Sequence, residues 1–330
     1  MSARRPIPAS LFGIPVGIMG LAGAWRVGAR IWGLPEVVAD AIAVVGASSW
    51  ALLVVLYANK WLSNPTAARQ EALDPIQSSF VSLIWISTML VAVAAMQVSR
   101  TWGEWVFGVS VACQLALGIW LLGRMWKGGY GPDFATPALY LPAVGQNFVA
   151  AAGAAAYGWP EIASWLFGCG VISWFATESV VLLRASTREP LPRGLRPAMG
   201  VQLAPPVVGG LAYLGLTSGT PDMAAHILFG YGLFQAALLL RLWPWMRQDS
   251  FSPGYWAFSF GTTALPTMAM RMVERGASGP MNWVAPVLFV AANLVIAYFA
   301  VCTFYRGMRG TLLQMPAAAV DSSTAATART

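Results

Sequence analysis

Ten apolar stretches, each about 20 residues long, occupy most of this 330-residue chain. A helix needs about 20 apolar residues to cross a bilayer, and lipid offers no partner for unpaired backbone amides. Only 10% of the residues are charged, whereas about 25% are charged in ordinary soluble domains. The chain is therefore predicted to be an all-α integral membrane protein of ten transmembrane helices, with no separate soluble domain.

The stretches define one transmembrane domain, residues 11–306. Residues 1–10 are expected to form a cytoplasmic N-terminus, and residues 307–330, which are small and polar near their end, a disordered cytoplasmic tail. In chain order the predicted spans are 11–30, 37–59, 76–98, 103–123, 138–158, 161–183, 197–217, 223–246, 254–272 and 281–306.

The basic residues predict the orientation, because Lys and Arg accumulate in cytoplasmic loops. With a cytoplasmic N-terminus, 15 basic residues fall on the inner side. The outer side then keeps five, which are Arg26, Arg30, Arg100, Arg271 and Arg275. Both termini are therefore expected in the cytoplasm.

Odd-numbered spans differ from even-numbered ones in carrying glycines, prolines, hydroxyls and amides. Interrupted backbone at membrane depth is tolerated where it is buried in protein or lines a watery cavity. The alternation predicts five helical hairpins, each with a kinked inner helix and a lipid-facing outer helix, around a central pore. Ordinary helix–helix contacts are also rich in small residues, so packing remains an alternative explanation for each segment. The candidate pore-lining residues are Phe12, Gly13, Pro15, Phe80, Pro142, Phe148, Pro205 and Gly261.

The predicted path carries almost no charge. Four phenylalanines, Phe12, Phe80, Phe148 and Phe260, recur along it, and simple core packing is an equally good account of the first three. A bulky ring at a constriction can close a path by excluding water. An uncharged lining suits weakly selective, passive permeation.

Two charged residues lie within outer helices. Glu178 and Arg241 each precede the cytoplasmic end of their span by five residues, roughly 7–8 Å. They are candidates for an intramembrane ion pair, or Glu178 is a proton-coupling site.

Several function classes find no support in the sequence. The chain lacks a GxxxxGK[ST] loop for ATP and any nucleophile or paired-carboxylate motif, so we expect no enzyme and no catalytic residue. One histidine and three cysteines without CxxC spacing predict neither a metal site nor a cofactor. No basic face interleaved with exposed polar groups suggests nucleic-acid binding.

Five segments together resemble the tellurite-resistance/dicarboxylate transporter family, and most closely its TehA-like bacterial branch, whose relatives include the plant guard-cell slow anion channels. The likeness runs from about residue 11 to 306 in order and spacing. The segments are FGIPVG (12–17), LYLPA (139–143), RPAMG (196–200), GYGLFQ (230–235) and WAFSFG (256–261).

The resemblance implies ten helices around a pore in each protomer of a homotrimer, in the bacterial inner membrane. It also implies passive anion passage blocked by a phenylalanine of the ninth helix, which matches Phe260. The adjacent prolines Pro205 and Pro206, and Pro266 beyond the gate position, depart from the family pattern and put the pore width in doubt. The alternative is a proton-coupled carrier of C4-dicarboxylate, sulfite or tellurite-like oxyanions.

Overall fold

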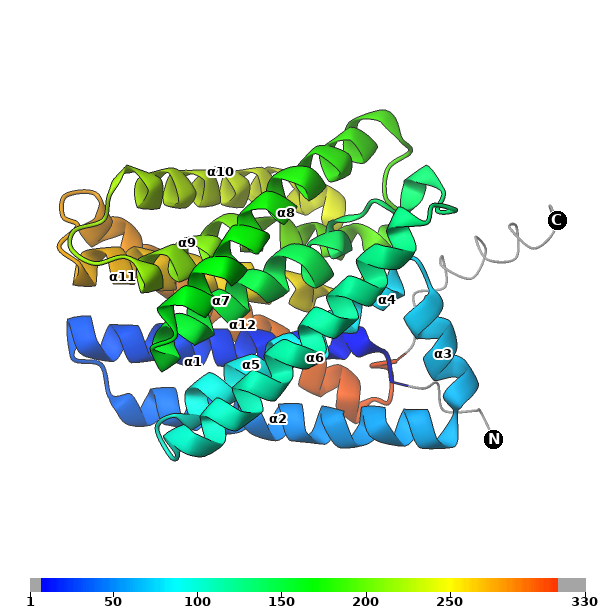
Figure 1. Ribbon diagram of the computed structural model, residues 1–330, viewed down its shortest axis with the longest axis horizontal. Helices are drawn as coiled ribbons and strands as arrows, with labels where there is room; N and C mark the ends of the chain where they lie inside the picture. The colour runs from blue at the N-terminus through cyan, green and yellow to red at the C-terminus, as the bar shows by residue number, and fades with distance from the viewer. Residues whose placement is uncertain (1–6, 314–330) are drawn as a thin grey trace.

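The computed structural model describes residues 7–313, and within that part helix is the only regular secondary structure, with no strand. The expected tails lie largely outside the described residues. The α-helices are α1 (Gly13–Trp32), α2 (Glu36–Ser63), α3 (Pro65–Leu73), α4 (Gln77–Phe80), α5 (Ser82–Ala95), α6 (Arg100–Trp126), α7 (Gln146–Tyr157), α8 (Pro160–Thr187), α9 (Ala204–Leu216), α10 (Met223–Met246), α11 (Ser259–Glu274) and α12 (Met281–Met308) (Figure 1).

Short 3-10 or π segments precede several of these helices. Pro142 lies in the π segment, and Pro253 opens the 3-10 turn before α11. The segments are η1 (Ala9–Phe12), η2 (Pro132–Phe134), η3 (Pro137–Leu139), η4 (Leu141–Gly145), η5 (Arg193–Leu203) and η6 (Pro253–Phe258).

Each of the ten predicted stretches is helical, and eight of the described helices are long and apolar enough to cross a membrane. The fifth and ninth stretches, which contain α7 and α11, fall outside that set. The structure therefore confirms an all-helical, multi-pass membrane protein, and the ten-span arrangement stays a prediction.

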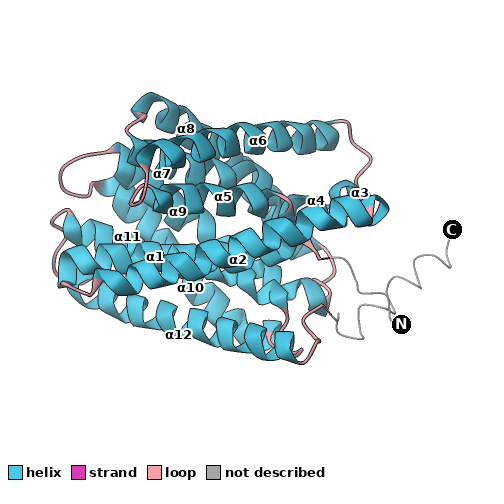
Figure 2. Cartoon of the chain, turned by 90° about the horizontal axis from the view of Figure 1, so that it is seen from below, coloured by secondary structure: helices cyan, strands magenta, loops and turns pink. Residues whose placement is uncertain are grey.

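Burial separates the long helices into two groups. In α2, α6, α8, α10 and α12 only 17–28% of the apolar window is buried in the molecule. The windows beginning at η1, α4 and η5 are 56–72% buried. The first group forms the outside of the bundle, as the two views show (Figures 1 and 2).

The buried helices contact one another in a closed ring. Helix α1 packs against α5 and α11, α7 packs against α5 and α9, and α9 packs against α11. Each peripheral helix packs on the ring helix that precedes it in the chain. The segments η1, α4, η3, η5 and η6 make a second closed circuit at the end where the ring helices begin.

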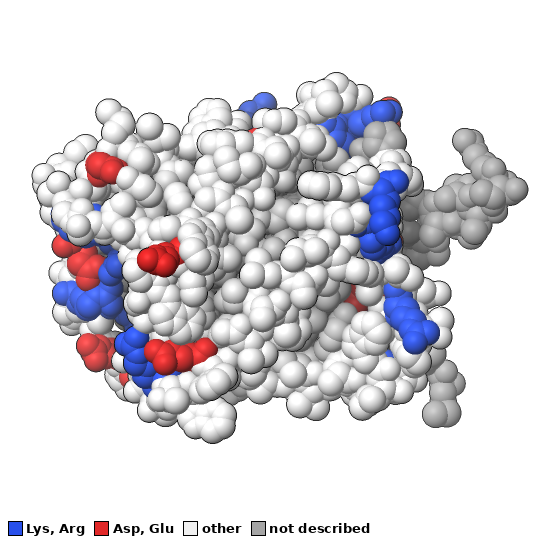
Figure 3. Space-filling view, viewed as in Figure 1, with Lys and Arg blue, Asp and Glu red and all other residues white. Residues whose placement is uncertain are grey.

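Charge gathers at the two ends of the bundle and leaves a broad uncharged band between them (Figure 3). We call the end that holds η1 and the C-terminal end of α12 the termini end, and the opposite end the far end. On the face shown, Lys and Arg dominate the termini end, whereas both signs mix at the far end. An uncharged band of this kind matches the hydrocarbon layer of a membrane.

Glycines let α1 and α11 approach closely. A Cβ added at Gly17 would lie 2.4 Å from the Cβ of Ser259, and one at Gly20 would lie 2.3 Å from the Oγ1 of Thr263. Small residues that allow backbones this near are typical of membrane helix contacts. The spacing of Gly13 and Gly17, four residues apart, is the sequence signal of this contact.

Candidate functional site

Helix α11 is mostly buried, and its half-buried residues are Thr262 and Val273 together with three others that share a face. Phe260, Thr267 and Arg271 are half-buried, and Ala264 between them is buried on the same face. Residues separated by 4, 7 and 11 positions share a helix face at 3.6 residues per turn. We call Phe260, Ala264, Thr267 and Arg271 the α11 stripe.

Phe260 occupies the end of the stripe nearer the termini end. Its Cδ2 would lie 3.4 Å from a Cβ added at Gly20, so the ring is directed towards α1. Arg271 follows 11 residues later, about 16 Å along the axis. The stripe thus carries an aromatic ring at one end and a guanidinium at the other, with small uncharged side chains between.

Other ring helices also show partly accessible small residues. In α1, Gly23 is half-buried, and a Cβ added there would meet nothing within 4 Å. Gly145 precedes α7, and Ala152 lies seven residues further along; both are half-buried, as is Leu211 in α9. These positions are open in helices that are otherwise packed on several sides.

Three of the four phenylalanines proposed from the sequence are buried. The ring of Phe12 is fully buried and meets that of Tyr57 in α2, edge to face, at 5.9 Å. Phe148 fills the space beside Gly170 of α8 and Gly209 of α9. Phe80 is 9% exposed, so only Phe260 remains partly accessible.

The proposed glycines and prolines are all buried: Gly13, Pro15, Pro142, Pro205 and Gly261. Gly13 faces the Cβ of Trp256, 3.2 Å from an added Cβ, and Gly261 faces Leu203 at 2.7 Å. Both glycines therefore serve close contacts between neighbouring segments. Whether any of the five borders a pore stays a prediction.

Glu178 lies among neutral donors. Its carboxylate accepts hydrogen bonds from the Tyr140 hydroxyl at 2.7 Å, the Trp174 Nε1 at 2.8 Å and the Tyr231 hydroxyl at 3.1 Å. Arg241 is exposed, and among the described residues no ion pair joins it to Glu178. Aromatic donors from α8, from α10 and from the junction between η3 and η4 satisfy the carboxylate in its place. The periodicity of α8 alone could not reveal them.

A buried ion pair that the sequence reading missed fixes the start of the ring. The Lys60 Nζ lies 2.6 Å from the Glu71 Oε2 and donates to the Ile7 carbonyl at 3.0 Å. Glu71 also accepts from the Ala9 amide at 2.8 Å and the Tyr57 hydroxyl at 2.9 Å. The acidic residue in an otherwise polar connecting segment was the available signal, but its partners come from two other elements, η1 and α2.

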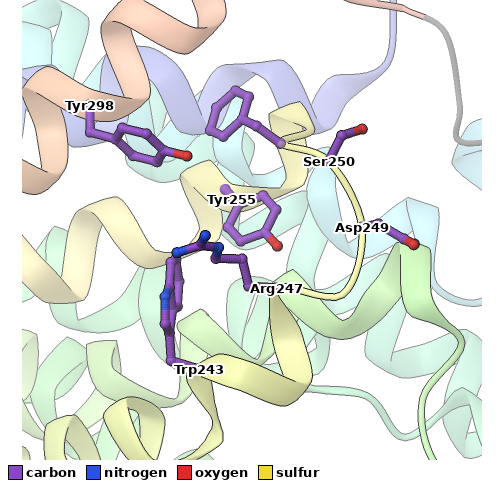
Figure 4. Close-up of a pocket in the computed structure, with 7 residues that line it drawn as sticks. Trp243, Arg247, Asp249, Ser250, Tyr255 and Tyr298 are labelled. Carbon is purple, nitrogen blue, oxygen red and sulfur yellow. The ribbon is translucent and has the colours of Figure 1, made fainter.

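A cavity of about 170 Å³ lies beside the ring at the termini end (Figure 4). Its walls come from the end of α10, the following loop, η6 and α12, and none of its residues belongs to the α11 stripe. The lining residues are Trp243, Arg247, Asp249, Ser250, Phe251, Tyr255 and Tyr298.

Comparison with known proteins agrees with this architecture. The profile of the SLAC1 family, described as voltage-dependent anion channel, matches residues 6–304. The chain is 33% identical over 308 residues to a "Tellurite resistance protein TehA homolog" of Haemophilus influenzae, covering 92% of both chains. It is 27% identical over 295 residues to the Arabidopsis thaliana "S-type anion channel SLAH1", covering 83% of this chain and 74% of the relative. It is 23% identical over 240 residues to the "Guard cell S-type anion channel SLAC1" of the same plant, covering 71% of this chain and 43% of the relative.

Proposed function

Because this chain belongs to the SLAC1 family of voltage-dependent anion channels, we propose that it is a passive anion channel of the bacterial cytoplasmic membrane. The channel has ten spans arranged as five hairpins, the ring helices surround its pore, and Phe260 is the gate. Both termini are cytoplasmic, so the termini end faces the cytoplasm and the far end faces outwards. The protein assembles as a homotrimer in which each protomer has its own pore.

The observation that carries the proposal is the α11 stripe inside a closed ring of helices. A helix that contacts α1, α9, α10 and α12 would be buried on every face if the ring had a solid centre. The α11 stripe, with Phe260 as its only large apolar member, is what a narrow path closed by one phenyl ring would produce.

The parallel direction of the ring helices supports an anion as the permeant species. α1, α5, α7, α9 and α11 all run from the termini end to the far end, so their partially positive N-termini share the cytoplasmic mouth. Helix N-termini attract anions. Between Phe260 and Thr267 the stripe has no charge that would hold an anion too tightly to release it.

The test is the current through Phe260→Ala in planar bilayers. Deleting the ring removes the obstruction, so the anion conductance is expected to rise at least about ten-fold, which corresponds to lowering a barrier by about 1.4 kcal/mol. Phe258→Ala is the matched control, because Phe258 is buried against Trp243. Its loss leaves a cavity in the packing and does not open the path. A folded Phe260→Ala protein with the negligible conductance of the wild type would refute the gate.

A second candidate, a proton-coupled carrier of C4-dicarboxylate, sulfite or tellurite-like oxyanions, is favoured by one observation. Glu178 is an intramembrane carboxylate held by neutral donors only, and such a group can take up a proton. The carrier predicts saturable uptake into liposomes that requires a pH gradient and is lost in Glu178→Gln. The channel predicts a current that reverses at the anion Nernst potential in both proteins.

A further inference from the structure

The far end presents an electrostatic difficulty for an anion channel. The five ring helices all end there, and a helix C-terminus carries the equivalent of about half a negative charge on its unpaired carbonyls. A ring of such ends would repel anions from the outer mouth. Positive side chains close to these carbonyls would offset the repulsion.

Two arginines bind the terminal carbonyls of ring helices directly. The Arg100 Nη2 donates to the carbonyl of Tyr157, the last residue of α7, at 2.5 Å. The Arg275 Nη1 donates at 3.0 Å to the carbonyl of Leu214 in the last turn of α9, and its Nε donates at 2.7 Å to Gly219. Both guanidinium groups therefore lie at negative helix ends.

The other three far-end arginines lie in the final turns of ring helices. Arg26 and Arg30 are in the last two turns of α1, and Arg271 is in the last turn of α11. Glu274 joins two of them, since it lies 2.6 Å from the Arg30 Nε and 2.9 Å from the Arg271 Nη1. Arg271 belongs to the α11 stripe and is 35% exposed in its side chain.

The acidic side chains at this end follow the opposite rule. Apart from Glu274, they lie in the first two turns or at the N-cap of the peripheral helices, and negative charge is favourable in the first turn of a helix. They are Glu36 and Asp40 of α2, Glu104 of α6, Glu161 of α8 and Asp222, the residue that caps α10. The far end thus has five arginines on or against ring helices and five of its six acids on peripheral helices.

From this sorting of charge we propose that the five arginines form a collar that keeps the outer mouth attractive to small anions, with Arg271 as the specificity-determining residue at the pore entrance. The inference rests on the proposed channel function. Two of the arginines are neutralised locally, since Arg26 pairs with Asp40 at 3.0 Å and Arg100 with Glu104 at 2.8 Å. The surplus positive charge of the collar therefore lies on Arg275 and on the cluster of Arg30, Arg271 and Glu274, which has two guanidinium groups for one carboxylate.

The experiment uses the full-length Phe260→Ala protein in planar bilayers, with chloride as the permeant probe. In this background Arg271→Gln is expected to lower the anion current entering from the far end about two-fold at 10 mM salt. A two-fold change is about 0.4 kcal/mol, which is the interaction of two unit charges roughly 10 Å apart in water. At 1 M salt, where the screening length is about 3 Å, the difference should shrink to about a tenth or less.

Two further variants separate charge from folding. Arg271→Lys keeps the charge and should retain most of the low-salt current. Arg69→Gln removes one positive charge from an exposed position of α3 at the termini end and should leave this current unchanged. Equal low-salt currents for Arg271→Gln and its parent, an equal loss in Arg271→Lys, or a loss that persists at 1 M salt would each overturn the collar. If the Phe260→Ala protein conducts and any of these results is found, the collar is refuted and the channel proposal stands. If the Phe260→Ala protein does not conduct, both proposals are overturned.

Discussion

Gly17 is where a single methyl group is expected to separate two ring helices. A Cβ at this position would lie 2.4 Å from both the Cβ and the Oγ of Ser259 and 3.1 Å from the Trp256 Cε3. Ordinary Cβ contacts begin about 1 Å further out, and Ser259 is fully buried. Gly17→Ala must therefore displace α1 from α11.

The magnitude follows from three contributions. Overpacking of this kind costs about 1–3 kcal/mol. The displacement also disturbs the Ser259 hydroxyl, which bonds the Trp256 and Gly13 carbonyls, and one lost hydrogen bond adds about 1 kcal/mol. Alanine's better helix propensity offsets about 1 kcal/mol. The net loss is about 1–3 kcal/mol, or roughly 2–6 °C in Tm for a chain of this size.

Gly23→Ala is the matched control, since it makes the same change in the same helix where an added Cβ meets nothing within 4 Å. It should gain up to about 1 kcal/mol from helix propensity. Both proteins are melted in detergent at one fixed scan rate, because membrane proteins of this size unfold irreversibly. If Gly17→Ala melts at the same temperature as Gly23→Ala, the close α1–α11 contact is not what stabilises this part of the ring.

Two other changes test charged residues at the two ends of the bundle. Lys60→Ala leaves the buried Glu71 carboxylate without its cation, so the free energy of unfolding should fall by about 3–5 kcal/mol. A Tm equal to that of the wild type would contradict the burial of the pair. The hydrogen bond from the Tyr213 hydroxyl, with help from the Ala225 amide, holds the pKa of Asp222 below its usual 3.8. The ionised Asp222 carboxylate therefore stabilises the folded protein above about pH 3.8, and this stabilisation is lost as the pH falls through the folded-state pKa. When the pH is lowered from about 5 to about 3, the Tm of the wild type should fall further than that of Asp222→Asn, which keeps the helix cap. An equal fall in both proteins would show that the Asp222 carboxylate does not stabilise the fold in this way.

Helix positions were largely predictable. The stretch 223–246 coincides with α10, because an apolar run preceded by the capping residue Asp222 marks both the helix and its start. The ninth stretch began five residues before its α-helix, since the segment from Pro253 to Phe258 winds as a 3-10 turn. Hydropathy measures how apolar a segment is and does not measure how tightly it winds, so the expected span and the observed α-helix differ there.

Which side chains are buried and which stay accessible was far less predictable. Phe12, Phe148 and Phe260 look alike in the sequence, yet the first two are buried against Tyr57 and Gly170 while the third stays partly accessible. A ring helix meets protein on several sides, so its pattern has no polar face to reveal where the centre lies. The same reason hid two of the partners of Glu178, Tyr140 and Tyr231, which lie 38 and 53 residues from it in the chain.

By itself the amino-acid sequence determined that the chain is helical, lies in a membrane and belongs among anion channel relatives, because hydrophobic length and short motifs are local properties of a polypeptide. The tertiary structure alone decided which helices close into a ring and which face of α11 stays open. It also brought arginines from α1, α6 and the end of α11 together at the far end. Such juxtapositions depend on packing between segments hundreds of residues apart, where every helix offers several equally apolar faces.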